Sequence, residues 1–181
     1  MDAKECIMTR RSIRNYTDQK VTREEVEEIV SLATYAPTWK NVQANRYIAV
    51  LDETIKNRIA DECIVDFPGN PRNIHNAPAL IVLTTVDKRS GYERDGSFST
   101  AKGTHWQSFD AGIAAQTFCL AAHELGFGTV IMGIYEEDKV SEILQVPEGQ
   151  SVSALIALGR PAEEPKGPKR KTVEEILSYR D

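Results

Sequence analysis

The chain has 181 residues, 41% hydrophobic and 27% charged, which is typical of a globular protein long enough to bury one full core. Its formal net charge of -5 argues against a nucleic-acid binder, because such a protein needs a broad basic face to displace counterions from phosphates. We find no N-terminal leader pattern and no window near the ~20 apolar residues of a membrane span, so we expect a cytoplasmic protein without membrane contact.

The cysteines give no sign of a disulfide framework or a metal site. Cys6, Cys63 and Cys119 are odd in number and widely spaced, without a CxxC motif or a nearby histidine pair. We therefore predict reduced cysteines that take no part in the chemistry, and no bound metal.

The first predicted element is a helix at residues 22–36. Thr22 is its N-cap, Glu25 completes a capping box, and apolar residues recur at helical spacing until Pro37 ends it. The same criteria predict a strand at 46–51, a helix at 52–65 and a strand at 79–86.

A polar excursion follows at residues 87–107. It is rich in Gly, Ser and Thr, with Tyr92, Phe98 and Trp106 scattered through it. Loops of this length inside a compact domain are often lids or binding loops, and we expect a mobile lid-like segment. On composition alone a disordered tip is an equal alternative.

Residues 110–125 predict a helix that is apolar on nearly every side. Such a helix must be buried nearly all round, either centrally within its own chain or under a second subunit. Both alternatives stay open at this point. Gly126 is placed to end the helix.

The remaining pattern completes an α+β chain. Further elements are predicted as a strand at 128–133, a helix at 136–145, a strand at 151–159 and a short helix at 173–179. No internal repeat or linker divides the sequence, so we expect one domain over residues 1–181 with about four strands amid helices.

The stretch TRRSIRNY, residues 9–16, gathers three arginines in an acidic chain. On a helical turn Arg10 and Arg14 would share a face, with the hydroxyl of Ser12 nearby. Arginine offers a planar fork that bonds two phosphate oxygens at once, so the group suits a phosphate. A solvated basic turn is the plainer alternative.

Four blocks of the sequence, in order, resemble the nitroreductase family of FMN-dependent oxidoreductases, from near Met8 to Tyr179. They are RRSIR, LATYAPTWKNVQANRYIAV, DAGIAAQTFCLAAHELGFGTVIMG and VSALIALGRPAEEPKGPKRKTVEEIL. The resemblance implies a three-layer α+β fold with a mixed or antiparallel sheet of four to five strands. It also implies an interlocked homodimer with two FMN sites at the subunit interface.

The resemblance assigns roles to the arginines. Arg10 and Ser12 would contact the FMN phosphate or ribityl chain, and Arg11 would act chiefly through its backbone. Arg14 would reach the pyrimidine edge of the flavin, where negative charge gathers on reduction. Arg170, with Lys169 as helper, would return to the phosphate from the far end of the chain.

Other cofactor positions are implied on two further segments. One is the loop that the partner subunit lends to the ring and ribityl chain, which matches Pro37, Thr38, Trp39 and Asn41. The other contributes backbone facing the flavin, where an N–H can bond N5, and matches Met132 and Gly133.

The sequence departs from the family at Trp39, where a small hydroxyl residue is usual, and at Ala44-Asn45, where Pro-Trp is usual. Trp39 would narrow the pocket or stack on a substrate, or else pack only at the dimer interface. His105 and Trp106 end the excursion and are candidate substrate contacts. His75 and His123 are assigned to structure or solvent.

The implied activity is hydride transfer from NADH or NADPH through FMN to a nitroaromatic, quinone or similar small acceptor, in two half-reactions. No GxGxxG lies in a βαβ setting, so we expect the nicotinamide to visit the flavin face without a dinucleotide domain. The alternatives are a flavoenzyme of the same fold with other chemistry, such as reductive dehalogenation or flavin breakdown, and a non-enzymatic flavin-binding protein.

Overall fold

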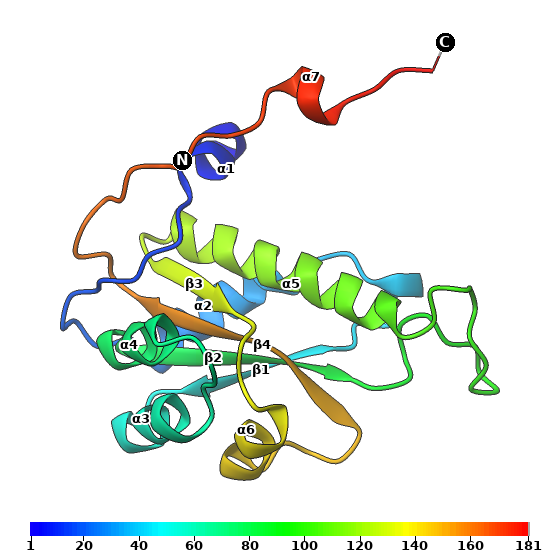
Figure 1. The fold of residues 1–181 in the computed structure, drawn as a ribbon, viewed down its shortest axis with the longest axis horizontal. Coiled ribbons are helices and arrows are strands. Elements are labelled where there is room, and N and C mark those ends of the chain that lie inside the picture. Colours follow the sequence, from blue (N-terminus) through cyan, green and yellow to red (C-terminus); the bar gives the residue numbers. More distant parts are fainter. Residues whose placement is uncertain (181) are drawn as a thin grey trace.

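Four strands form one antiparallel sheet at the centre of the molecule (Figure 1), in a computed structural model that describes residues 1–180. In the order β1-β2-β4-β3, the neighbours in the sheet are β1 (Asn45–Val50), β2 (Ala79–Val86), β4 (Gln150–Gly159) and β3 (Gly128–Met132). Strand β2 is buried along all but its last residue, because helices cover both faces of the sheet. This accounts for its apolar run ALIVL.

One face of the sheet is covered by α5 (His105–Glu124) and α2 (Arg23–Ala33). Phe118 of α5 is fully buried and packs in one core with Ile81 of β2 and Ile156 of β4. The predicted capping box of α2, between Thr22 and Glu25, is present. The predicted apolar helix therefore lies against the sheet within its own chain.

The opposite face is covered by α3 (Glu53–Glu62), α4 (Gly69–Asn76) and α6 (Glu137–Leu144). Figure 1 shows α5 above the sheet and α3 and α6 below it. Ile59, Ile74 and Val140 are fully buried and join the helices to β2 and β4 in a second core. The predicted three-layer α+β fold is thereby confirmed.

The two ends of the chain project from these layers on the same side of the molecule (Figure 1). They are α1 (Ala3–Thr9) and the tail that carries α7 (Val173–Ile176). Their apolar side chains are exposed, as the 63% exposure of Ile7 and the 72% exposure of Ile176 show. Both arms therefore carry apolar surface that their own chain leaves uncovered.

Two short helices were absent from the sequence prediction. Helix α1 is capped by Asp2, whose Oδ1 accepts the N–H of Glu5 at 2.8 Å. Helix α4 forms although GNPRNIHN has low helix propensity, because burial of Ile74 outweighs propensity. Helix α5 starts five residues before the predicted Asp110, and α7 ends at Ile176 rather than at 179.

The prediction of a helical turn at Arg10–Arg14 is wrong. Helix α1 ends at Thr9, and Arg10 has an extended ψ of 132°. The backbone then pairs with β3, since Ser12 bridges Thr129 in parallel. A strand partner was available, so the arginines follow a strand instead of sharing a helical face.

Candidate functional site

The arginine segment is fixed to the sheet by its backbone. The N–H of Ile13 donates to the carbonyl of Thr129 at 2.9 Å, and the Ile13 side chain is buried against Gly128. A Cβ at Gly128 would lie 2.5 Å from Ile13, so only glycine allows this close approach. Arg10 and Ser12 are half-buried and Arg14 is exposed. We call Arg10, Arg11 and Arg14 the arginine cluster.

Arg11 is committed to structure. Its Nη1 donates to the carbonyls of Met8 at 2.7 Å and Arg10 at 2.9 Å, so it satisfies carbonyls at the end of α1. The backbone of Gly167 lies against the same guanidinium, where an added Cβ would be 2.7 Å from Nε. The tail thus meets the arginine cluster shortly before Lys169 and Arg170, and both of these are exposed.

Strand β3 leads from the arginine segment to the other backbone positions of interest. Thr129 pairs with Ser12, and Met132 ends the strand about 10 Å further along at 3.3 Å per residue, with Gly133 directly after it. The Met132 side chain is buried in the second core, so only its backbone is available for contacts. Gly133 is exposed.

Helix α4 adds candidates that the sequence analysis missed. Asn70, Asn73 and Asn76 recur every third residue, and the Asn76 amide donates to the carbonyl of Arg14 at 3.4 Å. Asn70 and Asn73 are only 5% and 6% exposed. The spacing of three in GNPRNIHN was the available signal.

A buried lysine holds the end of α4. Lys56 is 3% exposed, and its Nζ donates to the carbonyls of Ile74 at 2.9 Å and His75 at 3.3 Å. Burial lowers the pKa of this ammonium group. His75 itself bonds Asp61 of α3 at 2.8 Å, which agrees with its predicted structural role.

The loop at residues 37–43 is held by polar contacts at the start of α5. The N–H of Trp39 donates to Oδ2 of Asp110 at 2.9 Å, and the Ser90 hydroxyl donates to the same oxygen at 2.6 Å. Asp110 is 2% exposed. One buried carboxylate therefore joins this loop, the excursion and α5.

The backbone of this loop is strained. Lys40, Asn41 and Gln43 all have left-handed φ values, 43°, 54° and 48°. Thr38 stabilises the turn, because its hydroxyl accepts the N–H of Gln43 at 3.0 Å. Clusters of such residues occur mainly at binding and catalytic sites. Pro37 and Asn41 are exposed beside it.

Three aromatic rings from the loop and from α5 meet here, and we call Trp39, Trp106 and Phe109 the tryptophan cluster. The ring centroids of Trp39 and Trp106 are 4.6 Å apart, and those of Trp106 and Phe109 are 5.4 Å apart. The structure thus brings the predicted pair Trp39 and Trp106 together. His105 is exposed at the first residue of α5.

The arginine cluster and the tryptophan cluster lie at opposite ends of α5. Thr9, next to Arg10, is 2.8 Å from Nε2 of His123, whereas Trp39 is bonded to Asp110. The helix between Asp110 and His123 is about 20 Å long at 1.5 Å per residue. Within one chain, the residues predicted to hold a single cofactor fall into two separate groups.

The chemistry of the rest of the described chain is limited. Within residues 1–180 no group of three or more His, Cys, Asp or Glu side chains is placed to hold a metal ion. Within the same range, no helix combines the length and apolar character that crossing a membrane would require. The cysteines are all buried, and burial raises the pKa of the Cys63 thiol to about 11.

The sheet order, the helical layers and the strand-bound arginine segment define an α+β protein of the nitroreductase fold. A nitroreductase family protein from Streptococcus pneumoniae TIGR4 has this fold, with a TM-score of 0.87 and 22% identity over 99% of this chain and 100% of that chain. The Nitroreductase family model matches residues 7–73 and 65–160. The chain belongs to the nitroreductase family.

Two further relatives are similar over most of their length. The chain is 31% identical to the FMN reductase (NADPH) of Bacillus subtilis over 189 aligned positions, which cover 94% of this chain and 72% of the relative. The FMN-dependent nitroreductase of Clostridium difficile R20291 is 26% identical, with a TM-score of 0.79 over 98% of this chain and 99% of that chain.

Proposed function

We propose that this chain is an FMN-dependent oxidoreductase that takes hydride from NAD(P)H and delivers it to a small acceptor such as a nitroaromatic or a quinone. Family membership and the relatives that are named an FMN reductase and an FMN-dependent nitroreductase support the cofactor and the donor. One observation carries the assignment to this chain: the tail lies against Arg11 at Gly167, just before Lys169 and Arg170, where the N-terminal arginine segment bridges β3.

The phosphate of FMN is assigned to Arg10, Ser12 and the tail residues Lys169 and Arg170. The contact between Gly167 and Arg11 supports this pairing, because it holds the tail against the arginine cluster. Charge-assisted hydrogen bonds to phosphate are the strong ones, and forked guanidinium groups suit them. Arg11 is already bonded to carbonyls and serves to shape the segment.

The flavin ring is assigned to the far end of β3. The strand runs about 10 Å from Thr129 to Met132, which suits a cofactor with its phosphate at one end and its ring at the other. Gly133 is exposed, and an added Cβ there would meet nothing within 4 Å, which leaves room for a ring, and we assign Arg14 as a donor to it. Bound FMN would supply N5, the atom that accepts and donates hydride.

The fixed charge of Arg14 has a chemical role in this assignment. Its Nη1 bonds only the carbonyl of Ser12, at 3.3 Å, within residues 1–180, so most of its donors are available. A cation beside the pyrimidine edge favours the negative charge that gathers there on reduction. The tryptophan cluster would shield the opposite side of the reacting centre from water.

Each site would be shared between two chains. Thr38, Trp39 and Asn41 lie about 20 Å from Arg10 along α5, so a second copy must supply them. The projecting arms, the exposed Phe109 and the half-buried Ile113 on α5 offer apolar surface for a homodimer. The nicotinamide and the acceptor would then use the same open flavin face in turn.

The test is purification followed by turnover. The account predicts a yellow protein that releases about one FMN per chain on denaturation and oxidises NADH or NADPH faster when menadione or a nitrofuran is added. A colourless protein that fails to bind added FMN would refute the proposal. Full FMN binding without any NAD(P)H oxidation would identify a flavin-binding protein instead.

A further inference from the structure

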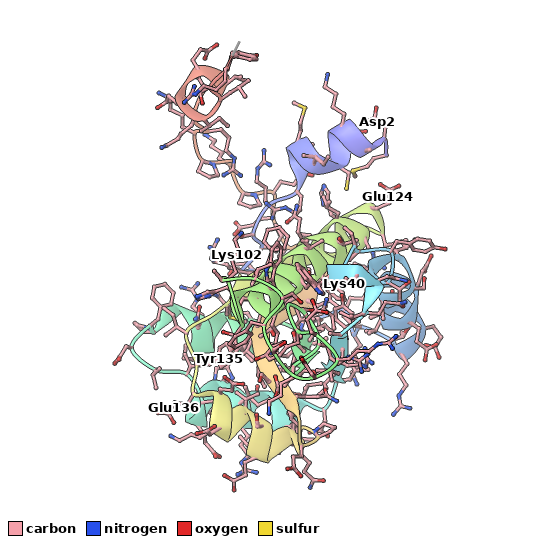
Figure 2. The ribbon with its side chains drawn as sticks, turned by 90° about the vertical axis from the view of Figure 1, so that its right-hand side faces the viewer. Asp2, Lys40, Lys102, Glu124, Tyr135 and Glu136 are labelled. Carbon is pink, nitrogen blue, oxygen red and sulfur yellow. The ribbon has the colours of Figure 1, made fainter. Side chains whose placement is uncertain are left out.

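Two lysine side chains lie over rings of the tryptophan cluster, and they differ in whether a carboxylate pairs with them. Nζ of Lys40 lies 5.5 Å from the ring centroid of Trp39, and Nζ of Lys102 lies 4.7 Å from that of Trp106. Figure 2, in which the excursion faces the viewer, shows the two lysines on either side of the start of α5. Both belong to the part of the molecule that the proposed function places over the flavin of a second chain.

Lys40 is already neutralised. Its Nζ is 2.8 Å from Oε1 of Glu93, in an ion pair between the loop and the excursion. Lys40 therefore ties two segments together, and little of its charge is available to a ligand. The other two carboxylates of the excursion, Asp87 and Asp95, accept the hydroxyls of Ser151 and Ser97, each at 2.6 Å.

Lys102 has no such partner. It is exposed, and no carboxylate lies within 4.0 Å of its Nζ in residues 1–180. It stands close to the N-terminus of α5, where the helix dipole adds positive potential, while the N–H groups of His105 and Gln107 bond the carbonyls of Lys102 and Thr104. The excess charge next to the aromatic rings is therefore positive.

The rings beside Lys102 are firmly placed. Nε1 of Trp106 donates to the Thr100 hydroxyl at 2.7 Å, and Trp106 packs edge-on against Phe109. Nε1 of Trp39, by contrast, is buried and has no hydrogen-bond partner within residues 1–180. A buried donor without an acceptor is costly.

We propose that the hydride acceptor of this protein is a planar aromatic compound that carries a negative charge, held by ring contact with Trp39 and Trp106 and by ionic contact with Lys102. This inference rests on the proposed function and narrows its acceptor class. Flat rings pack favourably on indole, and an anionic group would take the place that no protein carboxylate occupies. Aromatic carboxylates, quinone sulfonates and free flavin phosphates share this chemistry.

The same chemistry is present in NADPH, whose nicotinamide ring is attached to phosphates, so the test must separate acceptor from donor. The FMN-loaded enzyme is assayed with 1,4-naphthoquinone and with 1,4-naphthoquinone-2-sulfonate, and the ratio of their kcat/KM values is compared between variants. Lys102→Glu should lower the sulfonate-to-quinone ratio about five- to tenfold, because repulsion replaces attraction at an exposed site. Lys102→Arg should keep it.

Lys88→Glu is the matched control. Lys88 is an exposed lysine at the start of the excursion, and replacing it by Glu changes the net charge by the same amount. It should leave the ratio unchanged. An equal fall in Lys88→Glu, or no fall in Lys102→Glu, would overturn the proposal. The proposal would also be overturned if Lys102→Glu raised only the KM for NAD(P)H, because Lys102 would then bind the hydride donor instead of the acceptor.

A binding measurement keeps this inference separate from the proposed function. Equilibrium dialysis with 2-naphthoate and with neutral 2-naphthamide needs no turnover. The account predicts tighter binding of the naphthoate, and loss of that preference in Lys102→Glu but not in Lys88→Glu. Equal binding of the two compounds would reject the anionic acceptor even in an active enzyme. If the protein prefers 2-naphthoate over 2-naphthamide but oxidises no NAD(P)H, the proposed oxidoreductase function would be rejected and the anion site would stand.

Discussion

The arginine cluster and the tryptophan cluster are built on opposite structural principles. The arginines lie on a segment that bridges β3 at Ser12 and packs against Gly128, so backbone contact with the sheet places them. The tryptophan cluster depends on a loop with left-handed backbone and on one buried carboxylate, Asp110. Rigid scaffolds suit the binding of an invariant phosphate, whereas loops suit variable specificity. The comparison indicates that cofactor affinity and acceptor choice are separable in this chain.

The largest expected effect is on the phosphate end. Arg10→Ala and Arg170→Ala should each weaken FMN binding by about ten- to a hundredfold, since a charge-assisted hydrogen bond contributes about 1.5 to 3 kcal/mol. Titration of apoprotein with FMN measures this. Arg58→Ala is the control, because within residues 1–180 Arg58 pairs only with Glu62 on the surface of α3. Unchanged affinity in both arginine variants would remove the phosphate assignment.

The tryptophan cluster should depend on Asp110. Asp110→Ala leaves the Trp39 N–H and the Ser90 hydroxyl without their acceptor, which should lower the free energy of unfolding by about 1 to 3 kcal/mol. Urea unfolding measures this loss of stability, and near-ultraviolet circular dichroism reports the packing of the tryptophans. Asp95→Ala, in the exposed part of the excursion, should change stability by less than about 0.5 kcal/mol. Equal effects of the two changes would contradict the role given to Asp110.

Arg14 belongs to the arginine cluster but is assigned to the flavin ring, so it tests whether that cluster does more than bind the phosphate. Arg14→Ala should lower the flavin reduction potential by on the order of 10 to 30 mV, the size expected for loss of one partly screened charge. Equilibration with reference dyes measures the potential. If FMN affinity falls and the potential stays constant, Arg14 acts at the phosphate instead.

The smallest expected effect concerns pH at the arginine end. Burial, and then the positive charge of Arg10, hold the pKa of His123 below its ordinary value of 6.5. The folded protein therefore binds fewer protons than the unfolded chain, so stability should fall as the pH drops through 6.5. His123→Gln should reduce that slope in urea unfolding series at different pH values. A slope identical to that of the unmodified protein would exclude His123 as its source.

The sequence predicts the regular part of this molecule well. The apolar runs of β2 and β4, the capping box of α2 and the apolar helix α5 are local signals, and each is confirmed. Helix α4 was missed because its residues favour turns, and only tertiary contacts to Ile74 and Lys56 hold it. Local patterns carry no information about such contacts.

The candidate site shows the same division. The residue types came from the resemblance, but their separation into two groups appears only when α5 is seen to lie between them. The contact between Trp39 and Asp110 joins residues 71 positions apart, so no spacing in the sequence could indicate it. Whether the two groups meet across a dimer stays a prediction.

The most direct test of that prediction is complementation between two damaged homodimers. One carries Arg10→Ala with Arg170→Ala, and the other carries Thr38→Val with Asn41→Ala, each chosen because flavin binding is largely lost. After joint unfolding and refolding, a mixed dimer holds one site with both defects and one site with neither. The account predicts that FMN binding and NAD(P)H oxidation return in the mixture, in proportion to mixed dimers counted by native mass spectrometry. Mixed dimers that bind no more FMN than their parents would show that each site lies within one chain, contradicting the shared site.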